Sequence, residues 1–170
     1  MVEEIIKLIK ERRSIRRFTD QDVSKEDILN ILEAGRWAPS GRNNQPWRFV
    51  VIYSNDERKL ALSQCTKYGK IIQRANVLIV VLIDKDVMYS EVKDYQAIGA
   101  CIQNMLLTIH ALGLGGVWLG EILNQEKKVL DILKLDDTKY SLMAVIALGY
   151  PAEKGKSTRK PLTDLVLEGI

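Results

Sequence analysis

The stretch VLIVVLI, from Val77 to Ile83, is an unbroken apolar run of β-branched residues and leucines. A strand of this composition has no polar face to turn to water, which is typical of the middle of a sheet covered on both sides. The run is far shorter than the roughly 20 residues that a bilayer-spanning helix needs. It therefore predicts the central strand of a sheet, and no membrane span is expected.

Strands and helices alternate on both sides of this run. Residues 47–53 and 140–148 are rich in β-formers and predict two further strands. The spacing of apolar residues predicts helices over residues 2–11, 24–34, 56–68, 89–112 and 125–133. Ser24 with Asp27 is typical of a helix start, and Gly35 of a helix end. With no repeat and no linker, we expect one domain, residues 1–170, of the α/β or α+β class.

Composition narrows the functional classes. The chain has 170 residues, 46% of them hydrophobic, so it can bury a core and does not match a disordered chain. Its 25 Lys and Arg against 22 Asp and Glu leave a net charge of +3, too weak to imply nucleic-acid binding by itself. Cys65 and Cys101 form neither a metal pattern nor a disulfide framework, and no signal peptide is visible. We expect free thiols in a reducing cytoplasm and no metal site.

Basic residues gather near the two ends of the chain. The first group consists of Arg12, Arg13, Arg16 and Arg17, and the second of Lys156, Arg159 and Lys160. Chain termini often lie close together, so the two groups can form one anion site, most simply for a phosphate. The alternative is a solvated basic face.

Nucleotide-binding and hydrolytic signatures fail when they are checked residue by residue. The glycines at 113–116 follow a helix and lack the third glycine of a dinucleotide fingerprint, and residues 149–157 lack the first glycine of a P-loop. The lone His110 lies in an apolar helical segment and is expected in the core, so no hydrolytic triad is recognisable. An anion site without an acid–base set of side chains indicates that a cofactor supplies the chemistry.

Several segments, in order along the chain, carry a family resemblance. They are RRSIRRF at 12–18, WAPSGRNNQPW at 37–47, D-x-x-A-x-G-A-x-x-Q-N at 94–104, GLGGVWLG at 113–120, LGYP at 148–151 and RKPL at 159–162. The ordered set covers essentially the whole chain and resembles the nitroreductase family of flavoproteins. RRSIR also resembles the iodotyrosine deiodinase branch of the same superfamily.

The resemblance implies an α+β nitroreductase-like fold, with a mixed central sheet flanked by helices and an intertwined homodimer that binds FMN. Arg12, Arg13 and Arg159 would hold the phosphate and the ribityl chain, because a guanidinium fork suits phosphate oxygens. Ser14 would donate its hydroxyl at the pyrimidine edge of the flavin. Arg16 would lie near N1 and O2, where reduction places negative charge, so that its cation favours the reduced flavin.

The resemblance also assigns a loop and the segment around Leu119 and Gly120 to the site. The loop residues Pro39, Ser40, Gly41, Asn43 and Gln45 would reach the flavin of the other subunit. Leu119 and Gly120 would lie under the isoalloxazine ring, with a backbone N–H pointing at N5, the atom that carries the hydride. No side chain is then expected as a catalytic acid or base. Whether Lys67 or Lys70 touches the flavin stays open.

The function implied is ping-pong reduction, in which NAD(P)H reduces FMN and a nitroaromatic, quinone or enone then takes the electrons. One alternative is reductive dehalogenation on the same fold, which needs a long lid; residues 84–88 leave little room for one. A second is a protein that uses the cluster from Arg12 to Arg17 to bind RNA or an acidic partner. We expect no nucleic acid and no membrane as partner; the acceptor and the choice between NADH and NADPH stay open.

Overall fold

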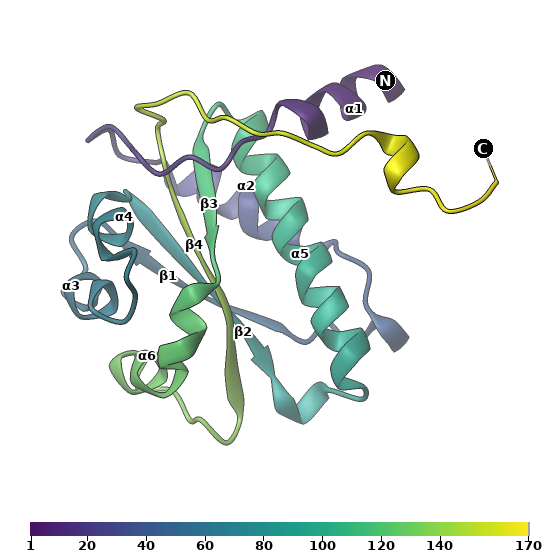
Figure 1. Ribbon diagram of the computed structural model, residues 1–170. Helices are drawn as coiled ribbons and strands as arrows, with labels where there is room; N and C mark the ends of the chain where they lie inside the picture. The colour runs from purple at the N-terminus through teal and green to yellow at the C-terminus, as the bar shows by residue number, and fades with distance from the viewer. Residues whose placement is uncertain (170) are drawn as a thin grey trace.

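The computed structural model, which describes residues 1–169, is built on a four-stranded sheet (Figure 1). In spatial order the strands are β1 (Trp47–Tyr53), β2 (Val77–Asp84), β4 (Tyr140–Gly149) and β3 (Gly115–Leu119). All neighbouring strands pair antiparallel, whereas a mixed sheet was expected. Within residues 1–169, parallel pairing is found at an isolated bridge between Ser14 and Gly116, in the segment that follows the first helix.

The expected central strand is confirmed, and its side chains alternate between two cores. All of β2 is buried, with β1 on one side and β4 on the other. Val77, Ile79, Val81 and Ile83 point into one hydrophobic cluster, and Leu78, Val80 and Leu82 into a second. This period of two is what a strand must show when both faces are covered.

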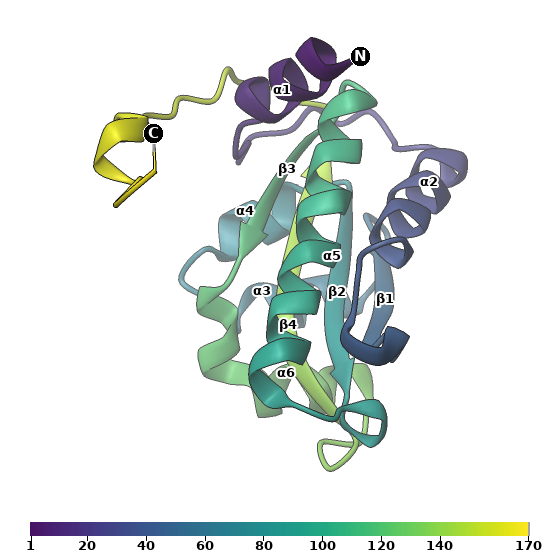
Figure 2. The ribbon, with the colours of Figure 1, turned by 90° about the vertical axis from the view of Figure 1, so that its right-hand side faces the viewer.

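Helices cover both faces of the sheet. The first cluster is shared with α2 (Lys25–Arg36) and α5 (Glu91–Ala111), which lie side by side in Figure 2. The second is shared with α3 (Arg58–Ser63), α4 (Gly69–Arg74) and α6 (Glu126–Leu133). None of the helices in residues 1–169 has both the length and the hydropathy to span a bilayer. Short 3-10 turns complete the chain at Gly41–Asn43, Lys85–Val87, Glu121–Gln125 and Leu162–Asp164.

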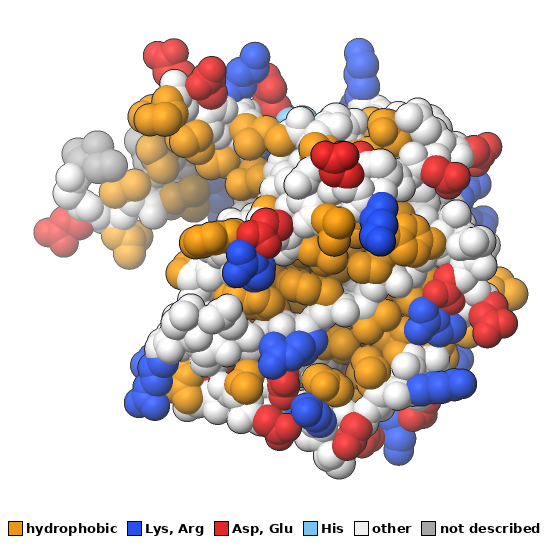
Figure 3. All heavy atoms as spheres, turned by 180° about the vertical axis from the view of Figure 1, so that it is seen from behind, with side chains coloured by type: hydrophobic (Ala, Val, Ile, Leu, Met, Phe, Trp, Pro, Cys, Tyr) orange, Lys and Arg blue, Asp and Glu red, His pale blue; other side chains and the backbone are white. Residues whose placement is uncertain are grey.

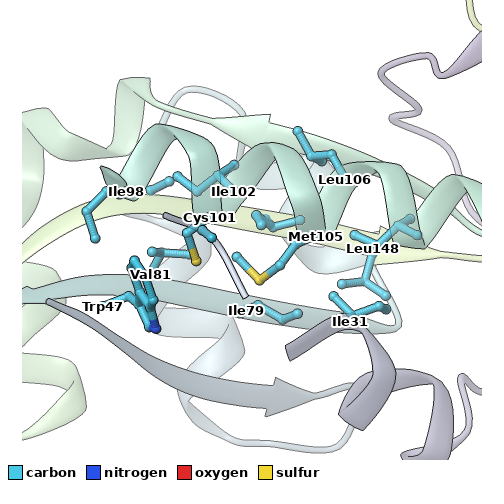
Figure 4. Packing of buried hydrophobic residues seen from close by; sticks show 14 of the residues in the cluster. Ile31, Trp47, Ile79, Val81, Ile98, Cys101, Ile102, Met105, Leu106 and Leu148 are labelled. Atoms are coloured by element: carbon cyan, nitrogen blue, oxygen red, sulfur yellow. The ribbon is translucent and has the colours of Figure 1, made fainter. Parts of the chain in front are cut away.

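Gly35 does not end its helix, and the close packing of α2 on α5 explains why a glycine is found there. The cap is as expected, because the Asp27 amide donates to Ser24 Oγ at 3.0 Å. The helix then runs past Gly35 to Arg36. A Cβ on Gly35 would lie 2.8 Å from Cγ of Met105, so the glycine lets α5 approach (Figure 4 shows Met105 in this cluster).

Two further local predictions were wrong. The helix expected over residues 56–68 is only α3, and a turn leads into α4, which the sequence pattern did not indicate. The turn brings Leu62 and Ile72 into the same cluster, which one straight helix would not do. The strand β3 was also missed, since Gly115 and Gly116 are poor strand formers. A Cβ on Gly115 would lie 2.7 Å from Ile15, so close packing selects the glycine there.

The first helix and the C-terminal tail leave apolar surface uncovered. Helix α1 (Val2–Glu11) has no buried residue, and its Ile5, Ile6 and Ile9 are exposed. In the tail, Leu165 and Leu167 are exposed as well. Figure 3 shows hydrophobic side chains gathered on the projecting part that α1 and the tail form. Apolar surface of this extent is typical of an interface.

Candidate functional site

The segment that follows α1 runs beside β3 in the same direction. Ser14 forms the parallel bridge with Gly116, and the Ile15 amide donates to the Gly116 carbonyl at 3.0 Å. Ile15 is buried and anchors the segment. Because the pairing is parallel, Arg16 lies toward the Leu119 end of β3, and Arg12 and Arg13 lie toward its beginning.

Arg16 and the end of β3 share a cavity of about 280 Å³. Its lining comprises Arg16, Tyr68, Ile71, Val117, Trp118, Leu119, Gly120 and Glu121. A Cβ on Gly120 would meet no atom within 4 Å, so the packing of this chain does not itself require the glycine. The open space above Gly120 leaves room for a flat group to approach the backbone.

The two basic groups come together around Arg12, Arg13 and Arg159, as the sequence predicted; the backbone at Gly155 packs directly against Arg13. Burial, with the positive charges of Arg159 and Arg13, lowers the pKa of the Arg12 guanidinium. Among residues 1–169, none of these three arginines forms an ion pair with a carboxylate. Like charges held together without a counter-ion are unfavourable, and an anion bound between them would relieve the repulsion. The cluster therefore suits a phosphate.

The arginines around this cluster are held by backbone and side-chain contacts. Arg13 Nη1 donates to the carbonyls of Lys10 at 2.5 Å and Arg12 at 2.8 Å. Arg159 Nη1 donates to the Thr158 carbonyl at 2.7 Å and to the Ser157 hydroxyl. Arg159 keeps further donors free for a ligand, because a guanidinium has five N–H groups.

The loop from Pro39 to Gln45 has an unusual backbone. Arg42, Asn43 and Gln45 adopt positive φ angles of 57°, 53° and 48°. Each such residue costs roughly 1–2 kcal/mol relative to a right-handed conformation. Within the loop, the Gln45 amide donates to Ser40 Oγ at 3.0 Å and the Asn43 amide to the Ser40 carbonyl at 3.0 Å. Its shape is maintained by specific contacts at some conformational cost, which is common at functional sites.

Within one chain, this loop does not meet the other predicted site residues. Asn44 contacts Asp94 in the first turn of α5, whereas Arg13 lines a 420 Å³ cavity with His110 near the last turn. Asp94 and His110 are about 24 Å apart along the helix axis, at 1.5 Å per residue. Figures 1 and 2 show the loop after α2 and the segment after α1 at opposite ends of α5. Pro39, Ser40, Gly41, Asn43 and Gln45 therefore stand apart from Arg12, Ser14, Arg16, Gly120 and Arg159.

Several residues at the 280 Å³ cavity were not singled out from the sequence. Glu121 accepts hydrogen bonds from the Thr66 hydroxyl and the Lys67 amide. These bonds lower the pKa of Glu121, and the bond from Thr66 has the largest effect. Glu121 thereby fixes the turn that carries Tyr68. Lys67 and Lys70 do not line the cavity, and Lys67 instead lies 5.2 Å from the Tyr68 ring centre. The signal for Glu121 was its place directly after Gly120.

A larger cavity, of about 630 Å³, lies on the other side of the same segment. Arg17 lines it, with Lys59 and Asn76, but none of the predicted cofactor residues does. Adjacent residues of an extended segment point to opposite sides, so Arg16 and Arg17 face different cavities. The buried Lys59 Nζ donates to the Ala75 carbonyl at 2.5 Å, at the C-terminal end of α4. This hydrogen bond at the negative end of the helix dipole gives the buried lysine a structural role.

Comparison with known proteins identifies the family of the chain. The sequence model of the nitroreductase family matches residues 9–66 and 58–150. The chain belongs to the nitroreductase family. The match contains all of the predicted site residues except Arg159. For this nitroreductase-family chain, the family match agrees with the α+β fold described above.

Individual relatives cover nearly the whole chain. A provisionally named nitroreductase of Desulfovibrio desulfuricans, crystallised in complex with FMN, is 54% identical; it aligns over 98% of this chain and 96% of its own, with a TM-score of 0.96. A provisionally named NADH dehydrogenase/NAD(P)H nitroreductase of Archaeoglobus fulgidus is 35% identical over 90% of this chain and 88% of its own. The iodotyrosine deiodinase of Thermotoga neapolitana is 25% identical over 85% of this chain and 87% of its own. The resemblance drawn from the motifs is confirmed.

Proposed function

We propose that this chain is an FMN-dependent NAD(P)H oxidoreductase of the cytoplasm that reduces nitroaromatic, quinone or enone acceptors by two electrons. The observation that carries the proposal is the line of groups along β3. The uncompensated arginine cluster lies at its beginning, Arg16 farther along, and the open space at Gly120 at its end. This order matches a molecule with a phosphate at one end and a flat ring at the other.

Each group has a role in holding such a molecule. Arg12, Arg13 and Arg159 would bind the phosphate, and Ser14 would donate its hydroxyl to the ring edge. Arg16 would set a positive charge beside N1 and O2. No carboxylate of residues 1–169 forms an ion pair with its side chain, so this charge is not neutralised within the chain. The backbone N–H at Leu119 or Gly120 would point to N5.

The division of labour between cofactor and protein follows from these roles. FMN, when bound, supplies the chemistry: it takes a hydride from NAD(P)H and passes two electrons to the acceptor. The chain orients the ring against the β3 backbone and keeps its Arg16 cation in place. Tyr68 and Trp118, which line the same cavity, offer aromatic surface to a planar substrate. No side chain is required as a general base.

The separation of the two halves of the site favours a homodimer. The loop at residues 39–45 lies near one end of α5 and the arginines near the other, so a single chain cannot bring both to one FMN. A two-fold axis that sets two copies of α5 antiparallel would place the loop of each subunit beside the arginines of its partner. The exposed apolar faces of α1 and the tail would be covered in such an assembly.

The dimer gives the first prediction. Light scattering of the purified protein should give twice the mass of one chain at micromolar concentration. The expected interface buries upwards of about 2,000 Å², as obligate homodimers do. A monomer that binds FMN stoichiometrically would refute the shared site.

The second prediction identifies the cofactor. The purified protein should be yellow, and mass spectrometry of the supernatant after denaturation should find FMN. Anaerobic NADH or NADPH should bleach the colour, and a quinone should restore it. A protein that stays apo with excess FMN, is colourless and binds RNA in a salt-sensitive way would instead support the nucleic-acid alternative.

The dehalogenase alternative is less well supported. Between Asp84, which ends β2, and Glu91, which begins α5, the chain forms only a short 3-10 turn and its connection. This segment is tied down, since the Lys85 amide donates to the Lys139 carbonyl at 2.8 Å and Asp94 accepts from the Tyr89 and Ser90 amides. It offers no long lid to grip a zwitterionic substrate.

A further inference from the structure

Asp94 is a buried carboxylate at the beginning of α5, with 0% of its surface exposed. Its Oδ2 accepts from the amides of Tyr89 and Ser90, both at 2.9 Å, and its Oδ1 from Asn44 Nδ2 at 2.6 Å. Burial alone would raise the pKa of Asp94, but these hydrogen bonds outweigh it and hold the pKa below its usual value. A buried carboxylate that makes charge-assisted bonds to two segments joins them firmly.

Asn44 is the residue through which the loop is attached. Both hydrogens of its amide group are used, one for Asp94 Oδ1 and one for the Val87 carbonyl at 3.1 Å. Its Oδ1 is buried and has no hydrogen-bond partner in the described chain. The side chain therefore acts as a double donor, which alanine cannot replace.

Tyr89 supports the loop at a second place. A Cβ on Gly41 would fall 1.7 Å from Tyr89 Oη, so the glycine backbone lies directly against the phenol. The Arg42 guanidinium lies 4.9 Å from the centre of the same ring. The strained loop is thus fixed at Gly41 and Asn44 against residues 87–94.

We propose that Asp94 is a positioning residue for the cofactor of the partner subunit. It holds Asn44, and Asn44 lies between Asn43 and Gln45, which would face that cofactor under the function proposed above, on which this inference rests. Ser40 is coupled to the same point through its bond to the Gln45 amide. Asp94 itself would not touch FMN; it keeps the donors of the loop in the geometry that binding needs.

Single variants test the effect on binding. Asp94→Asn and Asn44→Ala should each weaken FMN binding about tenfold, measured by quenching of flavin fluorescence in folded dimers. The matched control is Asp86→Asn, which removes an exposed carboxylate of the same region that pairs with Lys139 at 3.5 Å, and should leave the affinity within twofold. A merely structural role would lower the melting temperature of the apo protein and leave the affinity of the folded dimer unchanged, which would overturn the proposal. Should Asp94→Asn not fold, Asn44→Ala decides alone.

Mixed dimers test whether the action crosses the interface. Differently tagged Asp94→Asn and Arg12→Ala subunits are co-expressed, and the heterodimer is isolated. If Asp94 serves the partner's site, one site of the heterodimer combines both changes and the other has neither, so half of the sites should bind FMN with wild-type affinity. If Asp94 serves its own subunit, every site has one change and no wild-type site appears, which contradicts the proposal.

A failure of the proposed function and a failure of the role of Asp94 give different results. A wild-type protein that binds no FMN removes the proposed function and this inference with it. A wild-type protein that binds FMN, beside variants that bind it equally well, removes only the role of Asp94.

Discussion

Replacing Arg12 by Ala should weaken FMN binding by about ten- to a hundredfold while leaving the redox potential of the bound flavin almost unchanged. The substitution removes a charge-assisted contact to the phosphate, worth roughly 1.5–3 kcal/mol. The phosphate end is remote from the ring, so the energies of the oxidised and reduced states change together. Fluorescence titration of apo protein with FMN gives the affinity, and a spectroscopic redox titration gives the potential.

Arg17→Ala is the control for that experiment. Arg17 belongs to the same arginine-rich segment, but it faces the other cavity and lies 3.8 Å from Glu153. Its removal should leave the FMN affinity within twofold of wild type. The apo form of Arg12→Ala should be no less stable than wild type, because the repulsion from Arg159 and Arg13 is relieved. Equal affinity losses in the two variants would mean that the segment acts only through its general charge.

Replacing Arg16 by Ala should lower the midpoint potential of the bound flavin by about 30–60 mV. The guanidinium lines the cavity at the end of β3, where the negative charge of the reduced ring would lie. The reduced state then loses more stabilisation than the oxidised state. A charge-assisted contact of roughly 1.5–3 kcal/mol corresponds to this range, since about 30 mV equals 1.4 kcal/mol for two electrons.

Arg16→Lys separates charge from shape. It keeps the cation and should recover most of the potential, although an ammonium cannot reproduce the guanidinium fork. The Arg16 backbone amide donates to Glu153 at 2.7 Å and is present in both variants, so the segment should stay in place. A potential that is the same within error in wild type and Arg16→Ala would show that Arg16 lies away from the ring.

Local patterns in the sequence predicted most of the scaffold. The apolar run at 77–83 indicated a strand buried on both faces, and Ser24 with Asp27 indicated a helix start; both are present. The patterns failed at β3, where two glycines have low strand propensity and are selected by the closeness of Ile15 and Ile109. They failed again at residues 56–68, where the break between α3 and α4 depends on both helices reaching one core cluster.

By itself, the sequence determined which residues are available for the site. The arginine groups, the Ser-Gly-Asn loop and the glycine after β3 are local features, and their order along the chain identified the family. Only the tertiary structure decided which of them meet. Arg12 lies near Arg159, whereas Arg16 and Arg17 line two different cavities. The loop at 39–45 contacts Asp94, at the opposite end of α5 from the arginines. These contacts and separations involve segments far apart in the sequence. They depend on the length of the packed helix α5 and on the direction in which the segment after α1 pairs with β3. Local propensities therefore do not encode them.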